Sequence, residues 1–177
     1  IAMKAMSLHE IKDLLLNRYS KKSCDILAHE ANTDASVCVD LVSLVTGPDP
    51  LLAQRSAWSV GILGDINPNL LKPYCAELIA TLSRPHHDAV ARNIVRVWQT
   101  MDLPDAYLGE IFEICYNYLA NPHTAIAIRA FSATVCGKIC AKYPELKSEI
   151  LEMLPIWKEN TPPGIRVRIR QLEKELH

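Results

Sequence analysis

Four arginines in this chain stand 37 residues apart, and this spacing limits what the chain can fold into more than any other feature does. They are Arg55, Arg92, Arg129 and Arg166. Three prolines keep the same spacing, each seven residues before an arginine: Pro48, Pro85 and Pro122. Because two independent positions recur in the same phase, the sequence predicts a repeated structural unit.

Each predicted unit consists of a helix, a turn and a second helix. Proline fixes φ and lacks an N–H donor, so it ends a preceding helix but suits the turn before a new one. On both sides of Pro85, apolar residues recur at steps of three and four, which is typical of amphipathic helices. No segment alternates polar and apolar residues for long enough to predict a strand. We therefore expect an all-α fold.

The pattern also gives approximate boundaries. Ser7 and Glu10 have the spacing of a capping box, which predicts a helix start at this point. We expect one domain over residues 1–177, with an irregular N-terminal pair at about 7–31 and four repeats at about 33–66, 69–102, 105–142 and 144–177.

Composition narrows the class of protein. A chain of 177 residues with 49% hydrophobic residues can bury a large core, so it needs neither a metal nor a disulfide to fold. The six cysteines lie in helical patterns without a CxxC pair, and we expect reduced, buried thiols and no metal or cofactor. The net charge of −1 argues against a general attraction for nucleic acid.

Two sequence features bear on the location of the protein, a membrane-spanning segment and a signal peptide. The printed sequence contains no apolar run of about 18 residues and no signal peptide, so we expect a cytoplasmic protein that does not enter a membrane.

The segment GPDPLLAQRSAWSVGILGDI, residues 47–66, resembles the second helix of a HEAT repeat. The matching positions are an Asp-Pro turn, an arginine, a small residue and a Leu-Gly ending: Asp49, Pro50, Arg55, Ala57, Leu63 and Gly64. The resemblance implies a right-handed, armadillo-like α-solenoid (an α-α superhelix) of about five helical pairs, whose second helices line a concave binding surface. The 37-residue period is a little shorter than the roughly 40–47 residues of HEAT and armadillo units.

One departure from the family pattern concerns the acidic residue of the turn. In HEAT repeats the arginine commonly pairs with the turn aspartate, but only Asp49 is retained here, and His86, His123 and Asn160 replace it in the later units. The two histidines lie in successive units, roughly 10 Å apart, so we expect solvated turn residues and no shared metal ion.

The arginines without this acid allow two interpretations. They either cap carbonyls at the turns and pair with other acids, or they form a mildly basic groove that binds carboxylates. On the second interpretation the concave-face binding residues are Arg55, Arg92, Arg96, Arg129, Arg166 and Arg170. The partner expected there is a protein or an acidic peptide segment.

Two functions of different classes follow. The first is a non-enzymatic protein-interaction or scaffold module that binds a partner segment on its concave face. The alternative, implied by some HEAT-like proteins, is DNA binding or a DNA-alkylation-repair glycosylase, for which Trp98 and Asp102 stand one turn apart. The sequence favours the first, because Trp98 falls on the apolar face of its predicted helix and the net charge of −1 does not suit DNA. The chain also contains none of the common catalytic motifs, and it gives no prediction of oligomeric state.

Overall fold

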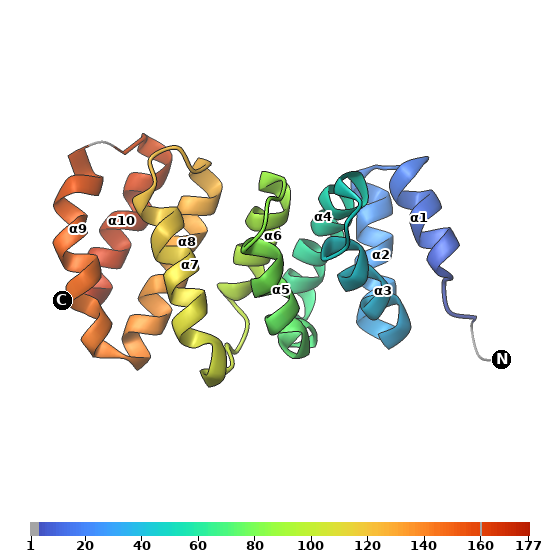
Figure 1. The fold of residues 1–177 in the computed structure, drawn as a ribbon, viewed down its shortest axis with the longest axis horizontal. Helices are drawn as coiled ribbons and strands as arrows, with labels where there is room; N and C mark the ends of the chain where they lie inside the picture. Colours follow the sequence, from blue (N-terminus) through green and yellow to red (C-terminus); the bar gives the residue numbers. More distant parts are fainter. Residues whose placement is uncertain (1–3, 160) are drawn as a thin grey trace. The chain divides into compact units, whose positions relative to one another are not determined.

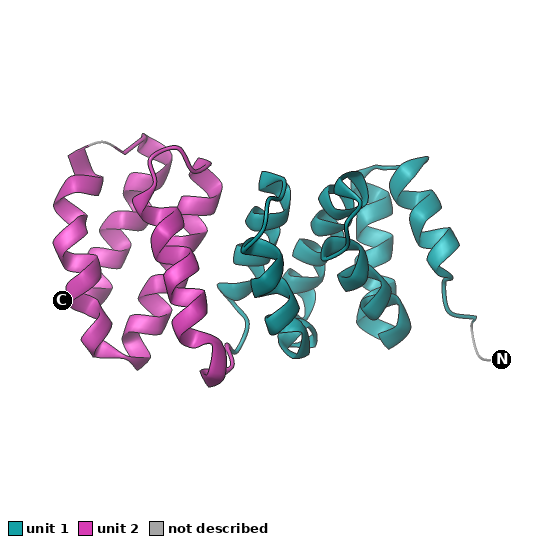
Figure 2. Cartoon of the chain, in the orientation of Figure 1, with its two compact units in different colours: residues 1–102 teal, residues 103–177 magenta. Residues whose placement is uncertain are grey.

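The computed structural model describes residues 4–159 and 161–177, and every regular element within these ranges is a helix. Contacts group the chain into two compact units, Ile1–Asp102 and Leu103–His177 (Figure 2). The boundary falls between two predicted repeats, 69–102 and 105–142. The predicted all-α class is confirmed, whereas the single domain over 1–177 stays a prediction.

Unit 1 contains three successive helical pairs, shown from blue to green in Figure 1. Its elements are α1 (Leu8–Leu16), α2 (Lys21–Thr33), α3 (Ala35–Val45), α4 (Pro50–Ile66), the 3-10 helix η1 (Pro68–Tyr74), α5 (Cys75–Leu82) and α6 (Asp88–Trp98). The predicted capping box starts α1, because the Ser7 amide donates to the Glu10 carboxylate at 2.7 Å and the Glu10 amide donates to Ser7 Oγ at 3.2 Å.

Unit 2 contains two helical pairs. Its elements are η2 (Asp105–Tyr107), α7 (Leu108–Ala120), α8 (Ile126–Lys142), η3 (Pro144–Leu146), α9 (Lys147–Glu159) and α10 (Pro163–Leu176). Pro48, Pro85 and Pro122 all lie in connections between the two helices of a pair, as the period predicts. Within the described ranges, no helix combines the length and the apolar character needed to cross a membrane.

The cysteines belong to the core, as predicted. All six are buried free thiols. Burial raises the pKa of Cys115 to about 12 and that of Cys140 to about 11, because a thiolate loses its hydration in an apolar interior. At neutral pH these side chains therefore act as small apolar groups.

Glycines set the distance between consecutive second helices within each unit. A Cβ atom on Gly61 of α4 would lie 2.1 Å from Asn93 Oδ1 of α6, and one on Gly64 would lie 2.4 Å from Val97 Cγ2. In unit 2, a Cβ on Gly137 of α8 would lie 2.7 Å from a carboxylate oxygen of Glu175 on α10. At Gly61 and Gly64 an added Cβ would therefore displace Asn93 or Val97, whereas at Gly137 the flexible Glu175 side chain could move aside.

We expect Gly64→Ala to lower the free energy of unfolding by about 1–3 kcal/mol, because the added methyl group must displace the stiff, β-branched Val97. Urea denaturation measures the change. Gly109→Ala is the matched control, since a Cβ at Gly109 meets nothing within 4 Å. The control should be neutral or stabilising by about 0.5–1 kcal/mol. Equal destabilisation of the two variants would contradict the close-packing interpretation.

Candidate functional site

The first periodic arginine caps the end of another helix. Arg55 Nη1 on α4 donates to the carbonyl oxygens of Leu15 and Leu16, at 2.8 and 3.1 Å. Its guanidinium carbon also lies 4.7 Å from the centre of the Tyr19 ring, a cation–π contact. The last carbonyls of a helix lack partners within the helix and carry partial negative charge, so a guanidinium group is favoured there.

The two periodic arginines of unit 2, Arg129 and Arg166, also donate to main-chain carbonyls. Arg129 Nε bonds the carbonyl of Leu119, near the end of α7, at 3.1 Å, and the residue is only 3% exposed. Its burial lowers the pKa of the guanidinium group. Arg166 Nε donates to the carbonyl of Thr161, before α10, at 3.0 Å. Arg129 therefore differs from the exposed position that the repeat register predicts.

The helix starts explain why equal spacing gives unequal positions. The arginine follows the first residue of its helix by five positions in α4, by four in α6, and by three in α8 and α10. Because each residue turns a helix by about 100°, these shifts point the guanidinium groups in different directions relative to the turn. Arg129 and Arg166, which lie closest to their helix starts, bond carbonyls that precede their own helices.

The other arginines predicted to bind a partner divide into paired and open ones. Arg96 on α6 pairs with Asp65 on α4, with its Nε 3.2 Å from Asp65 Oδ1. Arg92 and Arg170 are exposed, and neither has a hydrogen bond or ion pair to another residue in the described part of the chain. Only these two retain a fully open guanidinium group.

In unit 1, the turn residues before Arg55 and Arg92 cap the helices that follow them. Asp49 accepts from the amides of Leu51 and Leu52, both at 3.0 Å, and no ion pair joins it to Arg55 in the described ranges. In the next pair His87 takes the capping position, with its Nδ1 3.0 Å from the amide of Ala89.

The later turn positions differ from this arrangement. His86 Nδ1 lies 2.6 Å from the carbonyl of Arg84, and the amide of His123 donates to Asn121 Oδ1 at 2.9 Å. Asn160 lies outside the described residues. The sequence reasoning therefore found the turn positions but not their capping role.

An apolar strip runs along the solvent side of α4. Leu51 and Ile66 are 43% and 39% exposed, and Trp58 and Ile62 between them are half-buried. The Trp58 ring packs edge-to-face on Tyr19, with 5.9 Å between ring centres. We call this strip, together with Arg92 on α6 and the ion pair between Arg96 and Asp65, the second-helix surface of unit 1.

In unit 2 the structure brings Arg166 and Arg170 together in one cavity of about 610 Å³, here named the α10 pocket. Thr161, Ile169, Lys158 and Glu173 also line it. Lys158 is neutralised by Glu173, with Nζ 2.5 Å from Oε1. The two arginines consequently give this pocket its positive charge.

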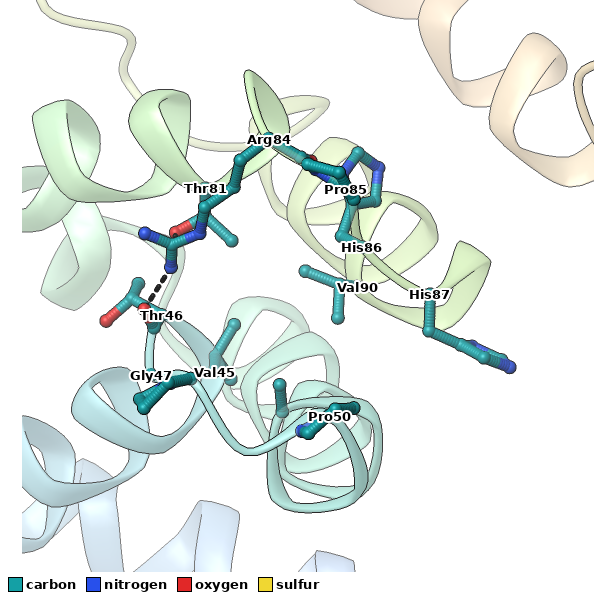
Figure 3. A pocket seen from close by; sticks show the side chains of 12 residues that line it. Val45, Thr46, Gly47, Pro50, Thr81, Arg84, Pro85, His86, His87 and Val90 are labelled. Atoms are coloured by element: carbon teal, nitrogen blue, oxygen red, sulfur yellow. Dashed lines mark hydrogen bonds between the residues drawn. The ribbon is translucent and has the colours of Figure 1, made fainter.

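A second cavity, of about 370 Å³, lies in unit 1 between the α3–α4 and α5–α6 connections (Figure 3). We call it the turn pocket. Arg84, which the sequence reasoning did not select, lines it and donates to the carbonyl of Thr46. The shared phase of Pro48 and Pro85 was the available signal, because it places the two turns side by side.

The two residues that the DNA-glycosylase alternative would use, Trp98 and Asp102, are buried and ion-paired, respectively. Trp98 is fully buried, so its ring offers no surface on which a base could stack. Asp102 pairs with Lys72 at 2.5 Å. No group of three potential metal ligands occurs among the described residues.

Comparison with known proteins gives one match. A family model described as a HEAT repeat domain matches residues 11–176, which is nearly the entire chain. No curated protein matches the chain, and no solved structure does.

The two interpretations of the arginine period can be separated by a matched pair of variants. We expect Arg129→Met to lower the free energy of unfolding by about 1–3 kcal/mol, because it leaves the buried Leu119 carbonyl without its donor. Arg92→Met, one period earlier, should change it by less than about 0.5 kcal/mol. Thermal and urea denaturation measure both, and equal effects would show that Arg129 has no special structural role.

The capping role of His87 gives a second expectation. Aspartate is among the best N-cap residues and its negative charge suits a helix N-terminus, so His87→Asp should stabilise unit 1 by about 0.5–1 kcal/mol. Conversely, Asp49→Ala should destabilise it by about 1 kcal/mol. Chemical denaturation followed by circular dichroism tests both, and a destabilising His87→Asp would refute this view of the cap.

Proposed function

Because this chain belongs to the HEAT repeat family, we propose that it is a non-enzymatic module that binds a segment of a partner protein on its second helices. Membership of this family indicates a protein-interaction or scaffold role in general terms. The choice of surface and of partner chemistry is our proposal, and it rests on the side chains that the second helices expose.

The observation that carries the proposal is the apolar strip of α4 together with an open arginine on α6, the helix that packs against α4. Leu51 and Ile66 expose large apolar side chains, and Trp58 stands between them in edge-to-face contact with Tyr19. Aromatic and apolar anchors beside arginine are the common composition of protein-binding surfaces. Arg92 supplies a guanidinium group that no other described residue neutralises.

The partner segment should therefore combine apolar and acidic side chains. Arg92 can hold a carboxylate through a bidentate pair, whereas the Arg96–Asp65 pair is already neutral and adds little charge. The α10 pocket offers similar chemistry in unit 2, since Arg166 and Arg170 line it and Lys158 is paired. The burial and engagement of Arg129 and Arg55 favour structural roles for these two.

Site-specific photo-cross-linking tests the proposal on the intact chain. A photoreactive phenylalanine analogue is placed at Ile62 or Ile66 on the second-helix surface, where it keeps an apolar side chain, or at Glu77, which is exposed on α5. After irradiation in a cell lysate, mass spectrometry identifies the cross-linked peptides. We expect the same partner segment at Ile62 and Ile66, enriched at least about tenfold over Glu77.

The charge contribution needs its own control. Arg92→Glu should reduce the cross-link formed at Ile62, because the new carboxylate repels an acidic segment. Lys22→Glu makes the same charge change at an exposed position of α2, and this control should leave the cross-link at Ile62 unchanged. Equal cross-linking at Ile62 and Glu77 would refute the proposed surface.

A further inference from the structure

The turn pocket of unit 1 is a second concave site, separate from the second-helix surface. Figure 3 shows Val45, Val90 and Pro50 in the space between the two connections, with Arg84 reaching Thr46 at one side. The Arg84 guanidinium is held there by the Thr46 carbonyl, and its Nη2 also lies 3.3 Å from Thr81 Oγ1. The cation is consequently fixed at the edge of an apolar depression.

The walls and the rim of this pocket differ in character. The accessible apolar lining comes from Pro48, Pro50, Ala53 and Pro85, and the two valines, each 1% exposed, lie beneath it. The depression is therefore mostly aliphatic. Its volume of about 370 Å³ lies within the usual range of about 300–1,000 Å³ for ligand pockets. Apolar walls with a few fixed polar groups are typical of sites that accept one apolar group in a defined orientation.

Charge complementarity selects the ligand class. Arg84, His86 and His87 line the pocket, and its lining contains no carboxylate. Asp49 and Asp88, the acids nearest in the sequence, are not among the lining residues, and Asp49 is engaged with the amides of α4. The N-termini of α4 and α6 lie at the same connections and add partial positive charge.

We propose that the turn pocket binds an acidic peptide segment, which inserts one apolar side chain between Pro50 and Pro85, above the buried Val45 and Val90, and places a neighbouring carboxylate on Arg84. The choice of a peptide rests on the protein-binding function proposed above. The site itself lies at the turns and uses no residue of the second-helix surface, so it constitutes an additional docking point.

A two-dimensional NMR titration of the ¹⁵N-labelled full chain tests this site directly. The probe is acetyl-Glu-Glu-Leu-Glu-Glu-amide, compared with peptides in which serine replaces leucine or lysine replaces glutamate. We expect shifts of the amides of Gly47, Ala53 and Val90 with the first peptide, and at least about tenfold weaker binding of the other two, which corresponds to about 1.4 kcal/mol.

Two variants remove the site by different means. Ala53→Leu fills the depression, and His87→Asp adds a negative charge at the rim while keeping a helix cap. Each should weaken binding of the acidic peptide at least about fivefold, and their circular dichroism should show that the fold is retained. The controls are Ala76→Leu, at an exposed position of α5, and His9→Asp, in the first turn of α1. Both controls should bind like the unmodified chain.

Several results would overturn the inference. These are no shift at millimolar peptide, equal binding of the lysine peptide, or unchanged binding in folded Ala53→Leu and His87→Asp chains. Tighter binding of octanoate than of the peptide would assign the pocket to a small amphiphile instead. Because the cross-links at Ile62 and Ile66 report on another surface, failure of this site and failure of the proposed function are distinguishable.

Discussion

Close packing between consecutive second helices is the contact on which each unit depends. Gly61 and Gly64 let α4 approach α6, and Gly137 does the same for α8 and α10. Because the helix axes are held this close, the first helices and the turns fall into fixed positions around them. This contact places the two connections beside each other to form the turn pocket. Because α4 also packs against α2 and α3, only one strip of its surface remains exposed to solvent.

The same packing creates a need for capping at the helix ends. The last carbonyls of a helix have no partner within it, and an unpaired buried carbonyl costs about 1–3 kcal/mol. Arg55 and Arg129 satisfy such carbonyls on α1 and α7, and Arg84 does so after α3. Arg55 and Arg129 therefore connect helix ends, and each bonds main-chain oxygens where the family pattern would pair it with an aspartate.

Binding then depends on the side chains that this framework leaves unsatisfied. Arg92 lies one position further from its helix start than Arg129 and is exposed, whereas Arg129 is buried. On the neighbouring helix α4, the apolar strip stays partly exposed, with Tyr19 packed on Trp58 at its middle. In the turn pocket, Arg84 combines the two roles, since the hydrogen bond that caps α3 also fixes its charge at the rim.

The sequence by itself determined the repeat, the all-α class, the positions of the turns and the cap at Ser7, because these follow from local spacing, proline stereochemistry and helical periodicity. It also identified the HEAT repeat family, which nearly the whole chain matches. Only the tertiary structure decided which arginines are buried, paired or open, and that Pro48 and Pro85 flank a pocket. Side-chain direction depends on where each helix starts and on which neighbour packs against it, and a one-residue shift of a start rotates a side chain by about 100°. A constant spacing of 37 residues does not encode that rotation.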